Sequence, residues 1–308
     1  MRRAGHVADI LGCSIVLADL SLTQGRLDEA GATYERALRL ADDHTGAVLP
    51  GTADMLVGLA QVAVERHDLD AAMAHLLRSR ELGELAALPQ TPYRWRVAMA
   101  HVTAPRSDVP AALTLLGEAL ALYAGDFSPD VRPVAAVRAR MLLTHGHIDR
   151  AFAWADEVGV SSSDDLSYLY EYEHVTLAHV LLARHAASGE VGSLRAAGAL
   201  LQRLLVAAEA GGRTGTVIEV LVLEALARQA DGDTPAASVQ LRRVRRRPRR
   251  LAAGEHPSGG TGLAESGRFG PEASIYALAL IGLVAALTIR AARHRPADRG
   301  RARTWHGR

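Results

Sequence analysis

The sequence predicts an all-α protein in which five to six helix pairs stack into a solenoid. A phrase of small and apolar residues occurs six times, and its copies begin at positions 25, 67, 107, 146, 192 and 232, a period near 40. A period of this size is typical of stacked helix pairs, because one pair alone cannot bury its apolar face. Apolar residues make up 49% of the chain and aromatic residues only 4%, which suits closely packed helices better than a β-sandwich.

The first copy of the phrase, residues 25–38, predicts one turn and one helix. Gly25 marks the turn, and Leu27, Ala30 and Tyr34 follow at the spacing of one helical face. Ala18 lies seven residues before Gly25, on the preceding predicted helix. Small residues on both helices allow them to approach closely, so we expect each copy to define a tightly packed pair.

The other copies preserve this arrangement. Their turns begin at His67, Ser107, Gly146, Gly192 and Gly232. An alanine also lies seven residues before four of these five turns, at Ala60, Ala100, Ala139 and Ala225. A small insertion before residue 192 breaks the spacing in the fifth copy.

The predicted helices follow in order from these turns and from the Pro and Gly punctuation. Their pairs are 5–23 with 27–43, 53–66 with 69–86, 93–103 with 109–123, 131–145 with 148–158, 166–187 with 193–210, and 214–230 with about 235–245. Asp164 and Asp165 are expected to cap the helix that begins at residue 166. Cys13 is the single cysteine and is predicted to be buried on an apolar helix face.

The character of the chain changes after the sixth copy. We expect a repeat solenoid over residues 1–237, a disordered basic and Gly/Pro-rich linker over 238–272, an apolar helix over 273–292 and a basic tail over 293–308. All 35 basic residues are Arg. Residues 1–240 carry a net charge of −10 and residues 241–308 a net charge of +11.

Residues 273–289 contain no charged side chain and are at the lower length limit for a membrane span. The Arg-rich flank after residue 289 would place the tail in the cytoplasm and the repeats outside. The N-terminus, however, lacks the apolar core of a signal peptide, and a lone cysteine fits a reducing cytoplasm. We therefore predict a cytoplasmic protein and keep membrane association through this helix as an alternative to simple packing.

The order of residues within each copy resembles the tetratricopeptide repeat. Leu17 and Ala18, then Ala30, Tyr34 and Ala37, reproduce its order of large apolar, small, small, aromatic and small residues. The longer period, near 40, is similar to the MalT-type repeat region of large LuxR-type transcriptional regulators. Three further stretches resemble that region: residues 126–133, 165–169 and 210–215.

The resemblance implies a region that senses effectors or contacts partner proteins. In that family it lies between a nucleotide-binding ATPase module and a C-terminal helix-turn-helix. The chain has no Lys, and therefore no Gly-rich loop ending in Gly-Lys-Ser/Thr, and it shows no helix-turn-helix pattern after residue 237. We read it as the sensor region of a truncated, split or frame-shifted regulator.

Aromatic residues supply the candidate contact sites. Tyr168, Tyr170 and Tyr172 are three of the seven tyrosines of the chain and lie beside acidic residues. They are interpreted either as packing tyrosines with a solvated acidic rim or as a contact patch on the inner surface of the solenoid. Trp95 is a second candidate partner contact, although a Trp in a helix pair is more often part of the core.

A basic run provides a candidate surface for phosphates or anionic membranes. Seven of the nine residues from 242 to 250 are Arg: Arg242, Arg243, Arg245, Arg246, Arg247, Arg249 and Arg250. Without interleaved aromatic residues or a recognition fold, the run favours nonspecific phosphate contact over sequence-specific DNA binding. A solvated linker explains it equally well.

No catalytic, metal-ligand or cofactor motif accompanies these features. The sequence therefore predicts a non-catalytic protein without a cofactor, which binds a protein partner or small effector as part of transcriptional control. The alternative function is a membrane-anchored scaffold that recruits a cytoplasmic partner.

Overall fold

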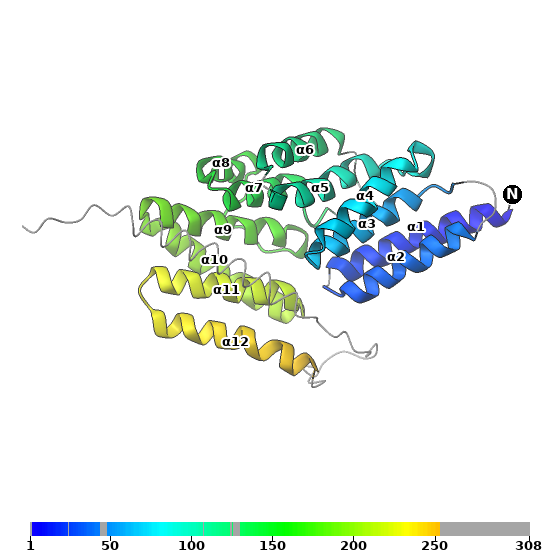
Figure 1. Cartoon of the computed structure of the whole chain (residues 1–308). Helices are drawn as coiled ribbons and strands as arrows, with labels where there is room; N and C mark the ends of the chain where they lie inside the picture. Colours follow the sequence, from blue (N-terminus) through cyan, green and yellow to red (C-terminus); the bar gives the residue numbers. More distant parts are fainter. Residues whose placement is uncertain are drawn as a thin grey trace, which may run out of the picture.

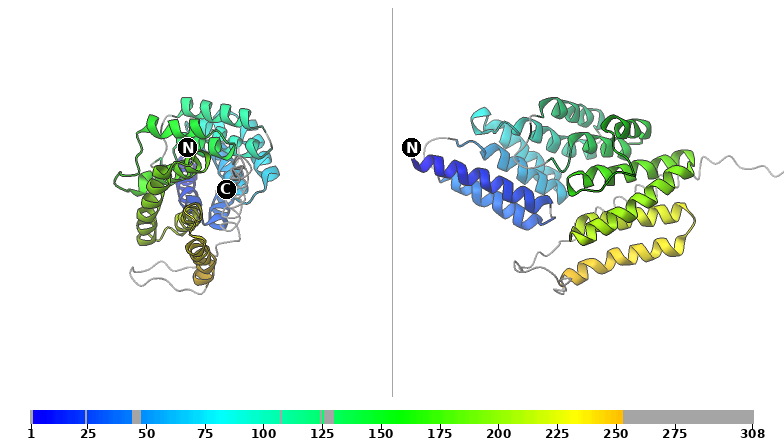
Figure 2. Two further views of the ribbon diagram at one scale, coloured as in Figure 1. Left: turned by 90° about the vertical axis from the view of Figure 1, so that its left-hand side faces the viewer. Right: turned by 180° about the vertical axis from the view of Figure 1, so that it is seen from behind.

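The computed structural model describes residues 2–23, 25–43, 48–106, 108–123, 125 and 130–252 (Figure 1). The described residues form twelve α-helices and three short 3₁₀ turns, with no strand among them. Successive helices pair, and the pairs stack from α1 and α2 at one end to α11 and α12 at the other (Figures 1 and 2). This arrangement confirms the predicted all-α solenoid, with six pairs.

Each pair consists of a first helix and a second helix. The first helices are α1 (Arg2–Thr23), α3 (Thr52–Glu65), α5 (Thr91–Thr103), α7 (Val134–Thr144), α9 (Glu171–Ser188) and α11 (Thr214–Ala230). The second helices are α2 (Leu27–Asp42), α4 (Leu69–Glu81), α6 (Val109–Leu122), α8 (Ile148–Val158), α10 (Val191–Ala210) and α12 (Thr234–Ala252). The 3₁₀ turns are η1 (Glu84–Ala86), η2 (Ala104–Arg106) and η3 (Tyr168–Tyr170).

The first helices form the inner row of the array. Helix α3 packs against α4 within its own pair and against α1, α2 and α5 in the neighbouring pairs. As a result, 11 of its 14 residues are buried, whereas only 3 of the 13 residues of α4 are buried. Because they are covered from several sides, the first helices contribute much of the apolar surface that folding removes from water.

The repeated phrase forms the tight contact within each pair. Its small residues are buried at the start of every second helix: Ala30, Ala72, Ala112, Ala151, Ala197 and Ala237. Asp68, Asp108 and Asp233 cap their helices by accepting hydrogen bonds from the backbone N–H three residues later, at 2.9–3.1 Å. At the first turn position of several copies the backbone has a positive φ. Gly25 and Gly146 adopt it in their copies, and His67 adopts it with a φ of 57°.

Tyr34 connects the first three pairs. Its ring lies against Gly58 of α3, where an added Cβ would overlap the ring. Its hydroxyl donates to the carboxylate of Asp19 on α1, and Arg94 of α5 reaches the same carboxylate at 2.6 Å. Burial and the adjacent Asp19 raise the pKa of Tyr34 well above its usual value, so the hydroxyl stays a donor.

Among the helix boundaries that differ from the sequence-based expectation, three within the array have a clear local cause. The predicted helix 69–86 ends at Glu81, because Gly83 adopts a φ of 74° and a 3₁₀ turn follows. The predicted start at residue 131 shifts to Val134, directly after Pro133. The helix expected from residue 166 begins at Glu171, and the Asp164 carboxylate accepts from the N–H of Ser161 at 2.7 Å, within a turn, instead of capping that helix.

The basic run belongs to a helix. Helix α12 continues to Ala252, so the expected disordered linker is wrong for residues 238–252. Arg is a good helix former, and Ala237 and Val244 pack towards the core. The remaining expected linker, the apolar helix 273–292 and the tail 293–308 lie outside the described residues.

Two further features concern the apolar faces of α1 and α10. Cys13 is exposed and not buried, because α1 turns Leu11 and Ile15 towards the core. Among the described residues, α10 is the one helix long and apolar enough to cross a membrane by length and composition. In the fold it packs against α9 and α11 and fully buries Leu200, Leu201 and Leu204, as a core helix does.

The Tyr34 contact predicts the effect of a single methyl group. We expect Gly58→Ala to lower the free energy of unfolding by about 1–3 kcal/mol, because the added Cβ overlaps a ring that is itself fixed by Asp19. Gly117→Ala on α6 is the matched control, since a Cβ there meets no atom within 4 Å. It should be neutral or slightly stabilising, and urea unfolding of both variants tests the pair. Equal stability of the two variants would contradict this packing.

Candidate partner-binding surface

The three candidate tyrosines lie where α8 connects to α9, and residues 167–172 are here called the tyrosine turn. Tyr168 and Tyr170 lie on η3 and expose 46% and 55% of their surface. Tyr172 lies on the first turn of α9 and is partly buried against the core. The turn therefore presents two aromatic side chains to solvent and uses the third for packing.

A buried ion pair fixes the tyrosine turn to the next pair of helices. The Glu171 carboxylate, whose side chain is 9% exposed, lies 2.6 Å from Arg213 Nη2 and 2.8 Å from Arg213 Nε. The hydroxyl of Thr216 donates to the same carboxylate at 2.8 Å. The Arg213 guanidinium also lies 5.7 Å from the centre of the Tyr168 ring. Two of the stretches that resemble the family region, 165–169 and 210–215, thus meet beside this ion pair.

The loop before the turn is held from both sides. His174 Nδ1 lies 2.8 Å from the carbonyl oxygen of Tyr170, and its Nε2 lies 3.6 Å from the Asp164 carboxylate. Arg203 of α10 donates to the carbonyl oxygens of Ser162, at 2.8 Å, and of Asp164. These contacts, together with the Glu171–Arg213 pair, limit the conformations that Tyr168 and Tyr170 can adopt.

Tyr172 leads into a polar strip across the inner row, defined by Arg140, Tyr172, Thr176, His179 and Glu219. The Arg140 guanidinium stacks on the Tyr172 ring with 3.9 Å to its centre. It also donates to Thr176 Oγ1 and to Glu219 Oε1, both at 2.7 Å. His179 Nε2 lies 3.0 Å from the same Glu219 oxygen. The strip therefore joins α7, α9 and α11, which belong to three different pairs.

The charges within the strip are mutually stabilised. Burial alone would raise the pKa of Glu219, but the Arg140 guanidinium and the hydrogen bond from His179 outweigh it and lower the pKa to about 2. Burial lowers the pKa of His179, although its hydrogen bond to Glu219 opposes this effect. The strip thus holds an Arg–Glu ion pair beside an imidazole whose neutral form is favoured.

Arg132 extends the strip towards the first three pairs. Its guanidinium lies 5.8 Å from the centre of the Tyr172 ring and 4.0 Å from the Glu65 carboxylate at the end of α3. Burial, with Arg132 nearby, lowers the pKa of His101 on α5 to about 4. A line of polar contacts therefore reaches from α3 to α11.

The sequence carried a signal for this strip that was missed. His101, Arg140, His179 and Glu219 recur at the period of the repeated phrase, one in each successive copy. Asp19, His101 and Arg140 each follow directly the alanine that lies seven residues before a turn. His101 and Arg140 lie six residues before their turns, whereas His179 and Glu219 lie thirteen residues before theirs, so their common feature is the spacing of 39–40 residues. Side chains one period apart on successive first helices lie near one another in a stacked array.

The other candidate residues lie elsewhere. Trp95 is half-buried between α4 and α5, where its Nε1 donates to the carbonyl oxygen of Leu76 at 2.9 Å. Arg242 is exposed, whereas Arg243 lies 3.2 Å from the Glu209 carboxylate. The side chains of Arg245, Arg246, Arg247, Arg249 and Arg250 lie outside the description. The fold does not bring Trp95 or the basic run to the tyrosine turn.

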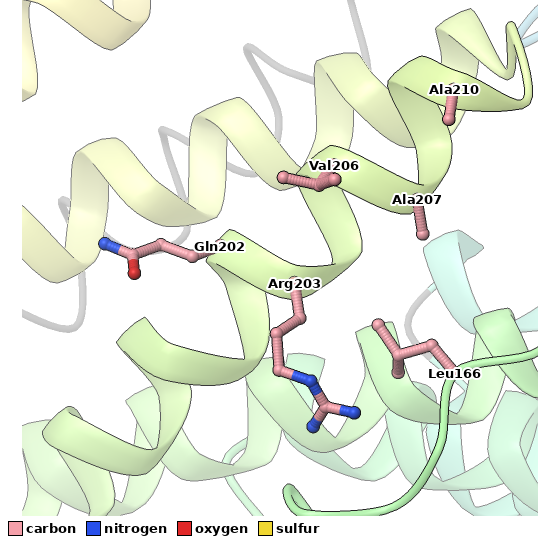
Figure 3. Close-up of a pocket in the computed structure, with 6 residues that line it drawn as sticks. All are labelled: Leu166, Gln202, Arg203, Val206, Ala207 and Ala210. Carbon is pink, nitrogen blue, oxygen red and sulfur yellow. The ribbon is translucent and has the colours of Figure 1, made fainter.

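An open hollow lies beside the turn on α10 (Figure 3). It is lined by Leu166, Gln202, Arg203, Val206, Ala207 and Ala210. Val206 exposes 69% of its surface. Within the described part of the chain, no group of three His, Cys, Asp or Glu side chains could hold a metal ion.

The Glu219 carboxylate predicts a pH-dependent contribution to stability. Its pKa in the folded chain, about 2, is below the ordinary value of 4.5. A carboxyl group with a lowered pKa stabilises the fold above its unfolded pKa, and this contribution is lost as the pH falls through the folded pKa. We expect Glu219→Gln to destabilise the chain at pH 7, with a difference from wild type that shrinks between about pH 4.5 and pH 2.

Urea unfolding at pH 7, 4.5 and 3 measures this difference. Glu118→Gln is the matched control, because Glu118 forms a pair with Arg96 at 2.8 Å but is 50% exposed. The control should change the stability by less than about 1 kcal/mol at each pH. A difference for Glu219→Gln that is the same at all three pH values would contradict the assigned ion pair.

Comparison with known proteins agrees with this architecture. A family model described as the MalT-like TPR region matches residues 1–245. A search of curated proteins finds no match. Among solved structures, the crystal structure of BtubC (BKLC) from P. vanneervenii is 13% identical with a TM-score of 0.46, covering 83% of this chain and 97% of that one. A putative kinesin light chain from Podosopora anserina with TPR-like repeats is 16% identical with a TM-score of 0.31, covering 80% and 98%.

Neither structural likeness bears on function at these identities and TM-scores. The family match, by contrast, covers most of the chain and agrees with the six helix pairs. The chain belongs to the MalT-like tetratricopeptide-repeat region family, a helical repeat architecture of the protein-interaction type.

Proposed function

We propose that this chain is the non-catalytic sensor region of a LuxR/MalT-type transcriptional regulator, and that it binds a protein partner or effector at the tyrosine turn in the cytoplasm. The observation that carries the proposal is the presentation of Tyr168 and Tyr170, which are exposed although the loop before them is tied to α10 at Ser162 and the residue after them, Glu171, is paired with Arg213. Exposed aromatic side chains on a fixed backbone lose little conformational entropy on binding, which makes them good anchors.

The polar strip supplies a route from the turn to the rest of the array. Tyr172 belongs to the tyrosine turn, and its ring lies against Arg140, which holds Glu219 of α11. A partner that binds one arrangement of these helices more tightly would shift the array towards that arrangement. The strip is therefore the element through which binding would change the relative angle of pairs.

The chemistry of the strip favours recognition over catalysis. Arg140, His179 and Glu219 are paired with one another, and the ion pair with Arg140 keeps the carboxylate charged. A general acid or base would need a pKa near the working pH and access to substrate. The fold of the family is also typically non-catalytic.

Cross-linking in cells tests the proposal. Full-length chain and the double variant Tyr168→Ala/Tyr170→Ala are each cross-linked in their native host, and the linked peptides are identified by mass spectrometry. We expect the wild type to link, near residues 165–173, to a polypeptide with an ATPase or helix-turn-helix segment, and the double variant to lose at least 90% of these links. Circular dichroism checks that the double variant has the same helix content as the wild type.

Leu85→Ala is the matched control, because Leu85 is an apolar side chain with 82% exposure on η1. It should retain the links. Links that survive in the double variant would contradict the tyrosine turn as the contact, and links confined to membrane proteins would favour the membrane-anchored scaffold instead.

A further inference from the structure

The hollow on α10 is an exposed apolar surface that the array itself does not cover. Leu166, Val206, Ala207 and Ala210 supply most of its lining (Figure 3). The charged head of Arg203 is used by the carbonyl oxygens of Ser162 and Asp164, so this side chain contributes mainly its apolar stem. An apolar segment that excludes water from such a lining lowers the free energy of the chain.

We propose that the hollow is the docking site of residues 273–289 of this same chain. This segment contains no charged side chain and includes the large apolar residues Ile275, Leu280 and Leu283. The inference does not depend on the identity of any regulator or partner. It assigns the segment a place on the solenoid.

The length of the chain allows this contact. Helix α12 ends at Ala252, so the stretch 253–272 connects it to the apolar segment. A stretch of that length reaches at most about 65 Å. Helix α10 has 20 residues and is about 30 Å long, because a helix rises about 1.5 Å per residue. Helices α10 and α12 both pack against α11 and end on the same side of the array (Figure 2), so the hollow, which includes Val206 and Ala210 near the end of α10, is within reach.

Charge favours the same place. Seven Arg follow the segment between positions 290 and 308, with a single acidic residue among them. Asp165, which precedes the lining residue Leu166, is exposed, whereas Glu209 is paired with Arg243. Residues 1–240 carry a net charge of −10, so docked residues 273–289 would bring the Arg-rich tail to an acidic body, where attraction adds to apolar burial.

A competing surface lies on α1. Ile10, Leu17 and Leu20 are 46%, 60% and 46% exposed and share one face of that helix. Cys13, which is also exposed, lies between Ile10 and Leu17 along this helix and interrupts the large side chains. The hollow on α10 offers a continuous, mostly apolar lining beside the exposed Asp165, so we assign the segment there.

Photo-cross-linking of the full chain tests the assignment. A benzophenone amino acid replaces Gln202, which lines the hollow and is exposed; in parallel chains it replaces Leu17 or the exposed Gln229 of α11. We expect the probe at Gln202 to link to residues 273–289 of its own chain, and the probes at the other two positions not to do so. Adding Val206→Glu should lower the yield about tenfold, whereas Val239→Glu on α12, at another exposed apolar site, should leave it unchanged.

Mixed isotope-labelled and unlabelled chains distinguish links within a chain from links between copies. Links mainly between copies, links from the Leu17 position, or a yield that Val206→Glu does not change would each overturn the assignment. The experiment is repeated with vesicles of phosphatidylcholine and phosphatidylglycerol. If the link from position 202 to residues 273–289 keeps its yield with vesicles, the docked segment is supported. If the link is lost and the chain floats with the vesicles, residues 273–289 belong to the membrane.

Discussion

Burial of each inner helix between its own partner and the neighbouring pairs is the constraint on which this structure depends. It explains why alanine recurs at fixed offsets from each turn, since Ala18, Ala60, Ala100 and Ala139 lie where inner helices meet other helices. It also explains why Arg140 and Glu219 on the inner row are paired. A charged group there loses hydration, and a partner on an adjacent helix offsets this cost.

The repeat period predicted the fold because every pair solves the same packing problem. The six turns, the pairing of helices and the buried alanines follow from residue spacing alone. The boundaries that were wrong, at residues 81, 134 and 171, depend on Gly83, on Pro133 and on an irregular loop, which no period describes. The length of α12 is not predicted, because an Arg-rich composition is also typical of a linker. A terminal helix needs only one apolar side, and Ala237 and Val244 provide it.

The candidate site was only partly predictable. The tyrosines were identified by their clustering, but the sequence could not show that Tyr168 and Tyr170 are exposed while Tyr172 packs against Arg140. That difference arises because η3 precedes α9, so the three residues do not share one regular helix. The ion pair of Glu171 with Arg213 joins positions far apart in the sequence and required the stacking of α9 on α11 to become visible. The polar strip, by contrast, could have been found from its period.

The Glu171–Arg213 pair holds the tyrosine turn in place, and hydrogen exchange of the backbone amides of the turn measures this directly. In the wild-type chain, amides of residues 170–174 should exchange more slowly than those of an unfolded chain, because the N–H groups of Tyr170 and Glu171 donate to the carbonyl oxygens of Ser167 and Tyr168. In Arg213→Met these amides should exchange at least tenfold faster, while amides of α3 remain unchanged. Amides at 170–174 that already exchange at the rate of an unfolded chain in the wild type would contradict the account.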